Sequence, residues 1–202
     1  ALKDFIAVPE LAKDLLEQIV FEARKSEYID AKSGVSARLS ITAFENLLST
    51  AERRALLCGE QKTMIRLSDF DGIIPAITGK VELVYEGEQE GTQAVAENLI
   101  KNGIKTLFPN YFPEIKKLEK QDTETPYDDI ISWFFNADVD FELLDDYTEE
   151  EYKAELDKIK PLSVFVKAYQ PSLNESDTYF MKEFVLWALV EFKKLSKYRF
   201  AE

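Results

Sequence analysis

Apolar residues recur at intervals of three and four over most of this chain, and glycine is too rare to interrupt them. Only seven glycines occur in 202 residues. Apolar residues with this spacing form one stripe on a helix, whereas a half-buried strand would alternate apolar and polar residues. We therefore predict an all-α protein in which amphipathic helices pack their apolar stripes together.

The expected helices follow from these stripes and from local start and stop signals. Thr148 with Glu151 three residues later forms a capping box, and Ser68 with Asp71 resembles a second helix start. Pro75 should break the helix that begins near residue 68, because proline lacks a backbone N–H donor. Other helices are expected at residues 9–26, 36–59, 93–107, 127–137, 148–159, 162–169 and 177–197.

A polar segment with two glycines, at residues 86–91, separates two parts of different charge. Through Glu86 the chain has 11 basic and 14 acidic residues, a net charge of −3. The remainder has 14 basic and 24 acidic residues, a net charge of −10. We predict one unit at residues 1–88 and an acidic helical extension at residues 89–202.

The composition argues against several classes of function. A net charge of −13 disfavours a nucleic-acid partner, since phosphate binding needs clustered lysine and arginine. The chain contains no histidine. That excludes a Ser-His-Asp or Cys-His catalytic set within the chain and removes the commonest metal ligand. We expect no metal site.

The sequence also indicates a compartment. The single cysteine, Cys58, cannot form an internal disulfide, which fits a reducing environment. We find no apolar run of about 18 residues and no signal peptide. We expect a cytoplasmic protein without a membrane span. Its first residue is alanine, and we expect the sequence to be the inside of a longer protein.

The clearest candidate for chemistry is the start of the second expected helix, where Gly34, Ser36 and Arg38 stand close together. Free backbone N–H groups and the helix dipole favour an anion at such a position. The planar arginine side chain can donate two parallel hydrogen bonds to a terminal phosphate. The pattern predicts Gly34, Ser36 and Arg38 as a binding site for a nucleotide phosphate.

The stretch from Ser33 to Arg38, followed by residues 44–46 (Phe-Glu-Asn) and 51–55 (Ala-Glu-Arg-Arg-Ala), resembles the sensor-2 segment of AAA+ ATPases. The nearest group is that of the magnesium chelatase ATPase subunit and the MoxR proteins. The resemblance covers the chain from its first residue to about residue 91. It implies that the first unit is the α-helical lid subdomain of such an ATPase.

The resemblance extends to the neighbouring segments. Residues 9–24 match the first lid helix, while Asp69 and residues 75–77 resemble a later one. Residues 85–91 also look like members described as magnesium chelatase-like. Beyond this point the chain resembles only the helical extensions of longer members.

The resemblance implies that Arg38 is the sensor-2 arginine, a catalytic residue that reaches the γ-phosphate of ATP, bound with Mg²⁺ in the full-length protein. The implied partners are the protein's own N-terminal AAA+ core, neighbouring ring subunits and a von Willebrand A-domain protein. Lid motion would couple ATP hydrolysis to remodelling of a client protein or to metal insertion.

The chain itself lacks a Gly-x4-Gly-Lys-Ser/Thr phosphate loop. Gly79-Lys80 does not supply one, because six residues separate it from Gly72 and Val81 follows it. We therefore expect this fragment alone neither to hydrolyse ATP nor to hold a bound cofactor, and the full-length protein to be the ATPase.

A different class of function stays open, namely a stand-alone helical interaction module without a nucleotide role. Adjacent Arg53 and Arg54 cannot share one helix face, so one should pack its stem on the helix while the other faces solvent or a partner. The aromatic residues 133–135 belong to a core or to a docking surface, and any exposed remainder would mark a protein interface.

Overall fold

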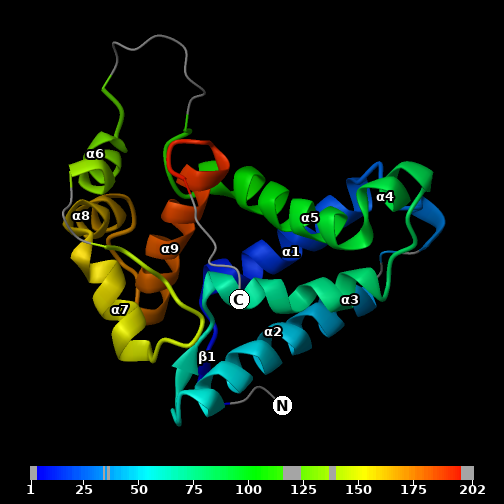
Figure 1. Cartoon of the computed structure of the whole chain (residues 1–202), viewed down its shortest axis with the longest axis horizontal. Coiled ribbons are helices and arrows are strands. Elements are labelled where there is room, and N and C mark those ends of the chain that lie inside the picture. Colours follow the sequence, from blue (N-terminus) through cyan, green and yellow to red (C-terminus); the bar gives the residue numbers. More distant parts are fainter. Residues whose placement is uncertain (1–3, 34, 36, 116–123, 137–139, 197–202) are drawn as a thin grey trace.

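The computed structural model describes residues 4–33, 35, 37–115, 124–136 and 140–196. Helices form nearly all of its regular structure, as the apolar periodicity predicts (Figure 1). They are α1 (Glu10–Lys25), α2 (Ala37–Leu57), α3 (Ile74–Thr78), α4 (Tyr85–Glu90), α5 (Thr92–Leu107), α6 (Asp128–Asn136), α7 (Glu149–Lys158), α8 (Lys160–Tyr169) and α9 (Glu175–Glu191), with the short 3-10 helices η1 (Ala31–Ser33), η2 (Leu67–Ile73) and η3 (Phe108–Asn110). Strands β1 (Ile6–Ala7) and β2 (Thr63–Met64) pair in parallel. Within the described ranges, no helix combines the length and the apolarity needed to cross a membrane.

Helix α1 packs against both α2 and α5, and α3 contacts α2 and α5 in turn. The buried side chains of α1 repeat at the spacing that the sequence predicts: Leu11, Ala12, Leu15, Leu16, Ile19, Val20 and Ala23. Gly103 allows the close approach of α5, since a Cβ atom there would lie 2.8 Å from Ile19 Cγ1. This packing forms the first of two helical groups.

The second group consists of α6, α7, α8 and α9, which lie together at one end of the long axis (Figure 1). Helix α9 is buried on nearly every side: Phe180, Met181, Lys182, Glu183, Phe184, Val185, Leu186, Ala188 and Leu189 are all inaccessible to solvent or nearly so. A helix buried all round belongs in the centre of a core. Accordingly, α9 also contacts α1, α5 and η2.

Helix α1 begins where its sequence predicts, and a distant residue completes that end. Pro9 occupies the N-cap position and provides no side-chain hydrogen bond. The backbone N–H of Glu10 instead donates to Oδ1 of Asp177, at 2.8 Å. A carboxylate at a helix N-terminus satisfies a free donor and interacts favourably with the dipole. Asp177 lies on α9, so this bond joins the two predicted units, whose boundary at residue 88 stays a prediction.

Two of the helix ends that differ from the sequence predictions have a clear physical cause. Helix η2 begins at Leu67, and the carboxylate of Asp69, rather than Asp71, accepts the backbone N–H of Arg66 at 2.7 Å. Helix α9 ends at Glu191, well before residue 197, because Lys193 adopts a positive φ of 60°. The N–H groups of residues 193 and 194 then bond to the carbonyls of residues 190 and 189, a Schellman motif formed without glycine.

Gly87 permits a close backbone contact between α4 and the loop that follows α1. A Cβ atom at residue 87 would lie 2.4 Å from the carbonyl oxygen of Tyr28. We expect Gly87→Ala to lower the free energy of unfolding by about 1–3 kcal/mol, because overpacking forces the backbone apart. Urea denaturation measures the change, with Glu88→Ala on the exposed face of α4 as the control. Equal stability of the two variants would contradict this contact.

Candidate functional site

Arg38 lies in the first turn of α2, and its side chain is exposed. The helix behind it is the longest in the described part of the chain, with 21 residues. Gly34 and Ser36, the other two predicted site residues, lie outside the described residues. The structure therefore places one of the three predicted residues, at the helix start that the sequence predicts.

Backbone bonds fix the loop that leads into α2. The N–H of Asp30 donates to the carbonyl of Glu82 at 2.8 Å, and the carbonyl of Tyr28 accepts from the N–H of Val84 at 3.0 Å. On the other side, Nε of Arg24 donates to the carbonyl of Val35 at 3.2 Å. The start of α2 is thus held against both α1 and the segment before α4.

Several exposed cations share this end of the molecule. They are Arg24 and Lys25 in the last turn of α1, Lys32 in η1 and Arg38. The end lies opposite α6, α7 and α8 along the long axis (Figure 1). The exposed carboxylates of Glu27, Glu82 and the three glutamates of α4 share this end (Figure 1), so the local charge does not by itself favour an anionic ligand.

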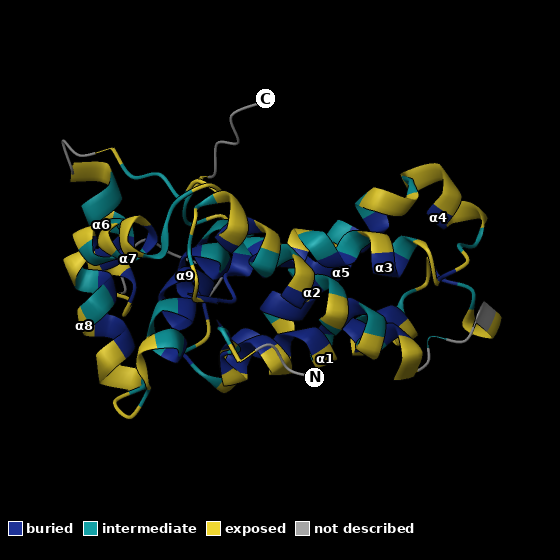
Figure 2. Ribbon diagram, turned by 90° about the horizontal axis from the view of Figure 1, so that it is seen from below, coloured by how far each residue is buried: buried dark blue, intermediate teal, exposed yellow. Residues whose placement is uncertain are grey.

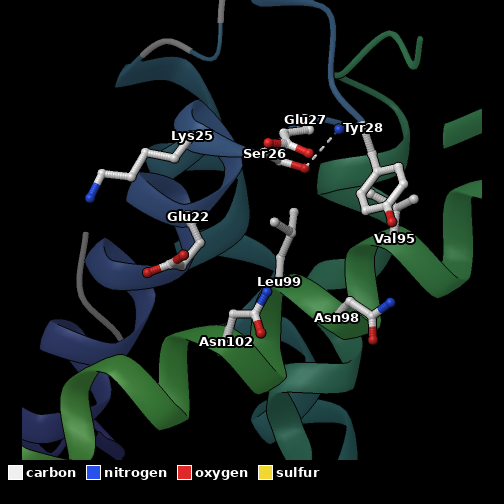
Figure 3. Close-up of a pocket in the computed structure, with 9 residues that line it drawn as sticks. All are labelled: Glu22, Lys25, Ser26, Glu27, Tyr28, Val95, Asn98, Leu99 and Asn102. Carbon is white, nitrogen blue, oxygen red and sulfur yellow. Dashed lines mark hydrogen bonds between the residues drawn. The ribbon is translucent and has the colours of Figure 1, made fainter. Parts of the chain in front are cut away.

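A shallow hollow of about 390 Å³ lies beside the C-terminal end of α1 (Figure 3). Leu99, Asn98 and Asn102 line it from α5, and residues 26–28 line it from the loop after α1. Its one cation, Lys25, points away from the hollow (Figure 3), and Glu22 and Glu27 add two carboxylates. We do not place the predicted nucleotide-phosphate site in this hollow, since the residues that line the hollow carry more negative than positive charge.

A buried group of charged residues, which the sequence did not predict, lies near the other end of α2. Arg54 is 6% exposed and Asp69 is 3% exposed. Nε and Nη2 of Arg54 donate to the two carboxylate oxygens of Asp69, at 3.1 and 2.8 Å. The guanidinium also donates to Thr63 Oγ1 at 2.9 Å and to the Met64 carbonyl at 2.8 Å. Arg54 thereby fastens α2 to β2 and η2, whereas Arg53 is exposed.

The ion pair with Asp69 also affects the pKa of Arg54. Burial alone would lower the pKa of the guanidinium, but the hydrogen bonds and charge of Asp69 outweigh that effect and raise the pKa. A bidentate arginine–carboxylate pair has both strength and a fixed geometry. It holds α2 in one orientation, and so fixes the direction in which the helix presents Arg38.

Arg66 extends this charged group toward α7. Its guanidinium carbon lies 4.4 Å from the ring centroid of Tyr152, and Nη1 donates to the Tyr147 carbonyl at 2.8 Å. Its Nε and Nη2 atoms have no hydrogen-bond partner among the described residues. Burial, followed by the charge of Arg54, lowers the pKa of Arg66. The side chain joins the N-terminal end of η2 to α7 and to the segment just before it.

Glu183 supplies the second buried carboxylate, from α9. Its Oε2 atom accepts the Tyr152 hydroxyl at 2.6 Å and the backbone N–H of Leu67 at 3.0 Å. Burial raises the pKa of Glu183 above its usual range, although both hydrogen bonds act in the opposite direction. The folded chain therefore binds this proton more tightly than the unfolded chain does.

A raised folded-state pKa has a definite consequence for stability. The stabilisation is complete below the unfolded pKa, about 4.3 for glutamate, and is lost as pH rises through the folded pKa. We expect the unfolding free energy of the wild type, relative to Glu183→Gln, to fall as pH rises. Urea denaturation from acid to neutral pH measures this difference, with Glu88→Gln as the exposed control. A difference independent of pH would contradict the raised pKa.

Local signals for these buried charges exist in the sequence. Arg54 stands seven residues after Leu47 and three after Ala51, both of which are buried, so it shares the apolar stripe of α2. Glu183 lies between the buried Phe180 and Phe184 on the apolar helix α9. A charged residue at a stripe position is an indicator of a buried ion pair, since burial of a lone charge costs much free energy.

Comparisons with known proteins leave the family open. No family model, no curated protein and no solved structure matches the chain. The predicted role of Arg38 therefore depends on its sequence motif, on its exposure and on its place at the start of α2.

Proposed function

We propose that this chain is the α-helical lid of an AAA+ ATPase of the magnesium chelatase and MoxR type, followed by an acidic helical extension. Arg38 is its sensor-2 arginine, and it binds the γ-phosphate of ATP·Mg²⁺ held by a core N-terminal to this segment. The observation that carries the proposal is the exposed position of Arg38 in the first turn of a long, anchored helix.

The two ends of α2 suit this role in different ways. The C-terminal half is fixed by the buried bond between Arg54 and Asp69, and the N-terminal turn presents Arg38 to solvent. Because the helix direction is fixed, only the side-chain rotamers of Arg38 have to be ordered when its planar guanidinium binds a phosphate. Gly34 and Ser36, which precede Arg38, would bring backbone and hydroxyl donors to the same phosphate.

The site also needs room for a second protein surface, because the phosphate is held elsewhere. The end that bears Arg38 lies away from α6, α7 and α8 (Figure 1). A nucleotide-binding core can approach that end without meeting α6, α7 or α8 (Figure 1). We propose that lid closure there transmits the nucleotide state to neighbouring ring subunits and drives remodelling of a client, with a von Willebrand A-domain protein as the partner.

The test uses the full-length protein that contains this segment. We expect a phosphate loop and a magnesium-binding acid pair N-terminal to Ala1, and ATP hydrolysis that is lost when the phosphate-loop lysine is replaced. The segment by itself should not hydrolyse ATP. A full-length protein without these motifs and without ATPase activity would contradict the proposal and favour a helical interaction module.

A further inference from the structure

Partly exposed apolar side chains gather on α6 and on the segment before α7. Phe135 is 77% exposed and Leu144 is 38% exposed, and their neighbours are half-buried. Figure 2 shows α6 as exposed and intermediate over most of its length. We name this surface the aromatic face; it consists of Ile131, Trp133, Phe134, Phe135, Phe141, Leu143 and Leu144.

Ring contacts hold the centre of the aromatic face in one arrangement. Phe134 and Phe141 have centroids 5.5 Å apart at 87°, and Trp133 lies 5.0 Å from Phe134 at 84°. Trp133 and Phe141 are also perpendicular, at 6.4 Å. Edge-to-face aromatic pairs of this kind are favourable geometries. The face is thus formed before any partner binds, and docking on it would cost little side-chain entropy.

Acidic residues lie close to these aromatic side chains along the chain. Between residues 121 and 152 the sequence contains no lysine or arginine. The described acidic residues nearest the face along the chain are Asp128, Asp129, Asp140, Glu142, Asp145 and Asp146, and all except the half-buried Glu142 are exposed. An apolar centre with a charged rim is the usual composition of a protein interface. All six of these residues are acidic, and Lys194 lies near enough to Asp128 to act on its charge.

We infer that the aromatic face is a docking site for a basic amphipathic segment of another protein. Apolar side chains of such a segment would cover Trp133 and Phe135, and its lysines or arginines would meet the acidic rim. A second copy of this chain, with the same net charge of −13, would be repelled. An anionic lipid surface or a nucleic acid would be repelled for the same reason. The inference does not depend on Arg38 or on a nucleotide.

The direct probe is a synthetic amphipathic helix of leucine and lysine, about 15 residues or longer so that it can form a helix. Its control is the same pattern with glutamate in place of lysine. The chain has two tryptophans, so a Trp187→Phe background leaves Trp133 as the fluorescent reporter. We expect the lysine peptide to bind, to shift Trp133 emission to shorter wavelength and to dissociate at high salt.

Two variants locate the binding surface. We expect Phe135→Ser to weaken the lysine peptide by about tenfold or more, as for an interface hot spot. Tyr85→Ser should leave the affinity unchanged; Tyr85 is 68% exposed and lies on α4, at the opposite end of the molecule (Figure 1). Both side chains are largely exposed, so unchanged thermal unfolding should accompany both substitutions. Asp129→Asn combined with Asp145→Asn should also weaken binding and reduce its salt dependence.

Three outcomes would overturn the inference. One is equal binding of the lysine and glutamate peptides, and another is unchanged affinity in the Phe135→Ser variant. The third is concentration-dependent self-association of the chain in sedimentation that Phe135→Ser abolishes, since that would assign the aromatic face to a second copy.

Discussion

Arg38→Ala in the full-length protein is expected to lower ATP turnover by about 100-fold or more. The physical reason is the loss of a cation that stabilises charge on the γ-phosphate in the transition state. Arg38 is exposed in the first turn of α2, so its removal should change the free energy of unfolding by no more than about 0.5 kcal/mol. Steady-state hydrolysis and thermal unfolding, measured together, separate the two effects.

Two further variants sharpen this test. Arg53→Ala removes an exposed arginine from the same helix, and we expect it to leave turnover near the wild-type value. Arg38→Lys keeps the charge but loses the planar pair of donors, so it should recover only part of the activity. Wild-type turnover in Arg38→Ala would contradict the sensor role.

Arg54→Ala is expected to cause the largest loss of stability. Asp69 would remain buried without the arginine that neutralises its charge, and removal of one member of a buried ion pair costs about 3–5 kcal/mol. The midpoint of thermal unfolding should fall by roughly 10 °C or more for a chain of this size. Chemical and thermal denaturation of the purified chain measure the change. Arg53→Ala is the control, because it makes the same substitution at an exposed position of the same helix.

A double substitution tests the mechanism of that loss. Arg54→Met with Asp69→Asn removes both charges and keeps a side-chain oxygen that can accept the backbone N–H of Arg66, so it should be more stable than Arg54→Ala alone. The Thr63 hydroxyl and Met64 carbonyl lose a donor in both variants, and their contribution cancels in the comparison. A double variant that is less stable than Arg54→Ala would show that Asp69 is not the source of the cost.

The fold was predictable from the sequence where local signals determine it. Periodic apolar residues predict α1, α2 and α5 correctly, and the capping box of Thr148 and Glu151 marks the start of α7 as predicted. The end of α9 was not predictable, because the positive φ falls on Lys193 rather than on glycine. The pairing of β1 with β2 also has no local signal, since it joins two-residue strands far apart in sequence.

The candidate site was likewise predictable from the sequence only in part. The position of Arg38 at a helix start follows from a short motif, and α2 does begin at Ala37; the binding role of Arg38 stays a prediction. The hydrogen bond from Arg66 to the Tyr147 carbonyl joins residues 81 positions apart. Periodicity within one helix cannot show which distant side chain will satisfy a buried charge. The contacts that join the extension to α2 and η2 therefore required the tertiary structure.

The central claim is that Arg38 detects the γ-phosphate, and nucleotide affinity tests it most directly. The measurement compares the Kd of a non-hydrolysable ATP analogue with that of ADP, for the full-length wild type and for Arg38→Ala. We predict that the variant binds ADP as the wild type does but binds the ATP analogue about tenfold more weakly, which corresponds to one charge-assisted contact. An unchanged ratio of the two Kd values would contradict the account.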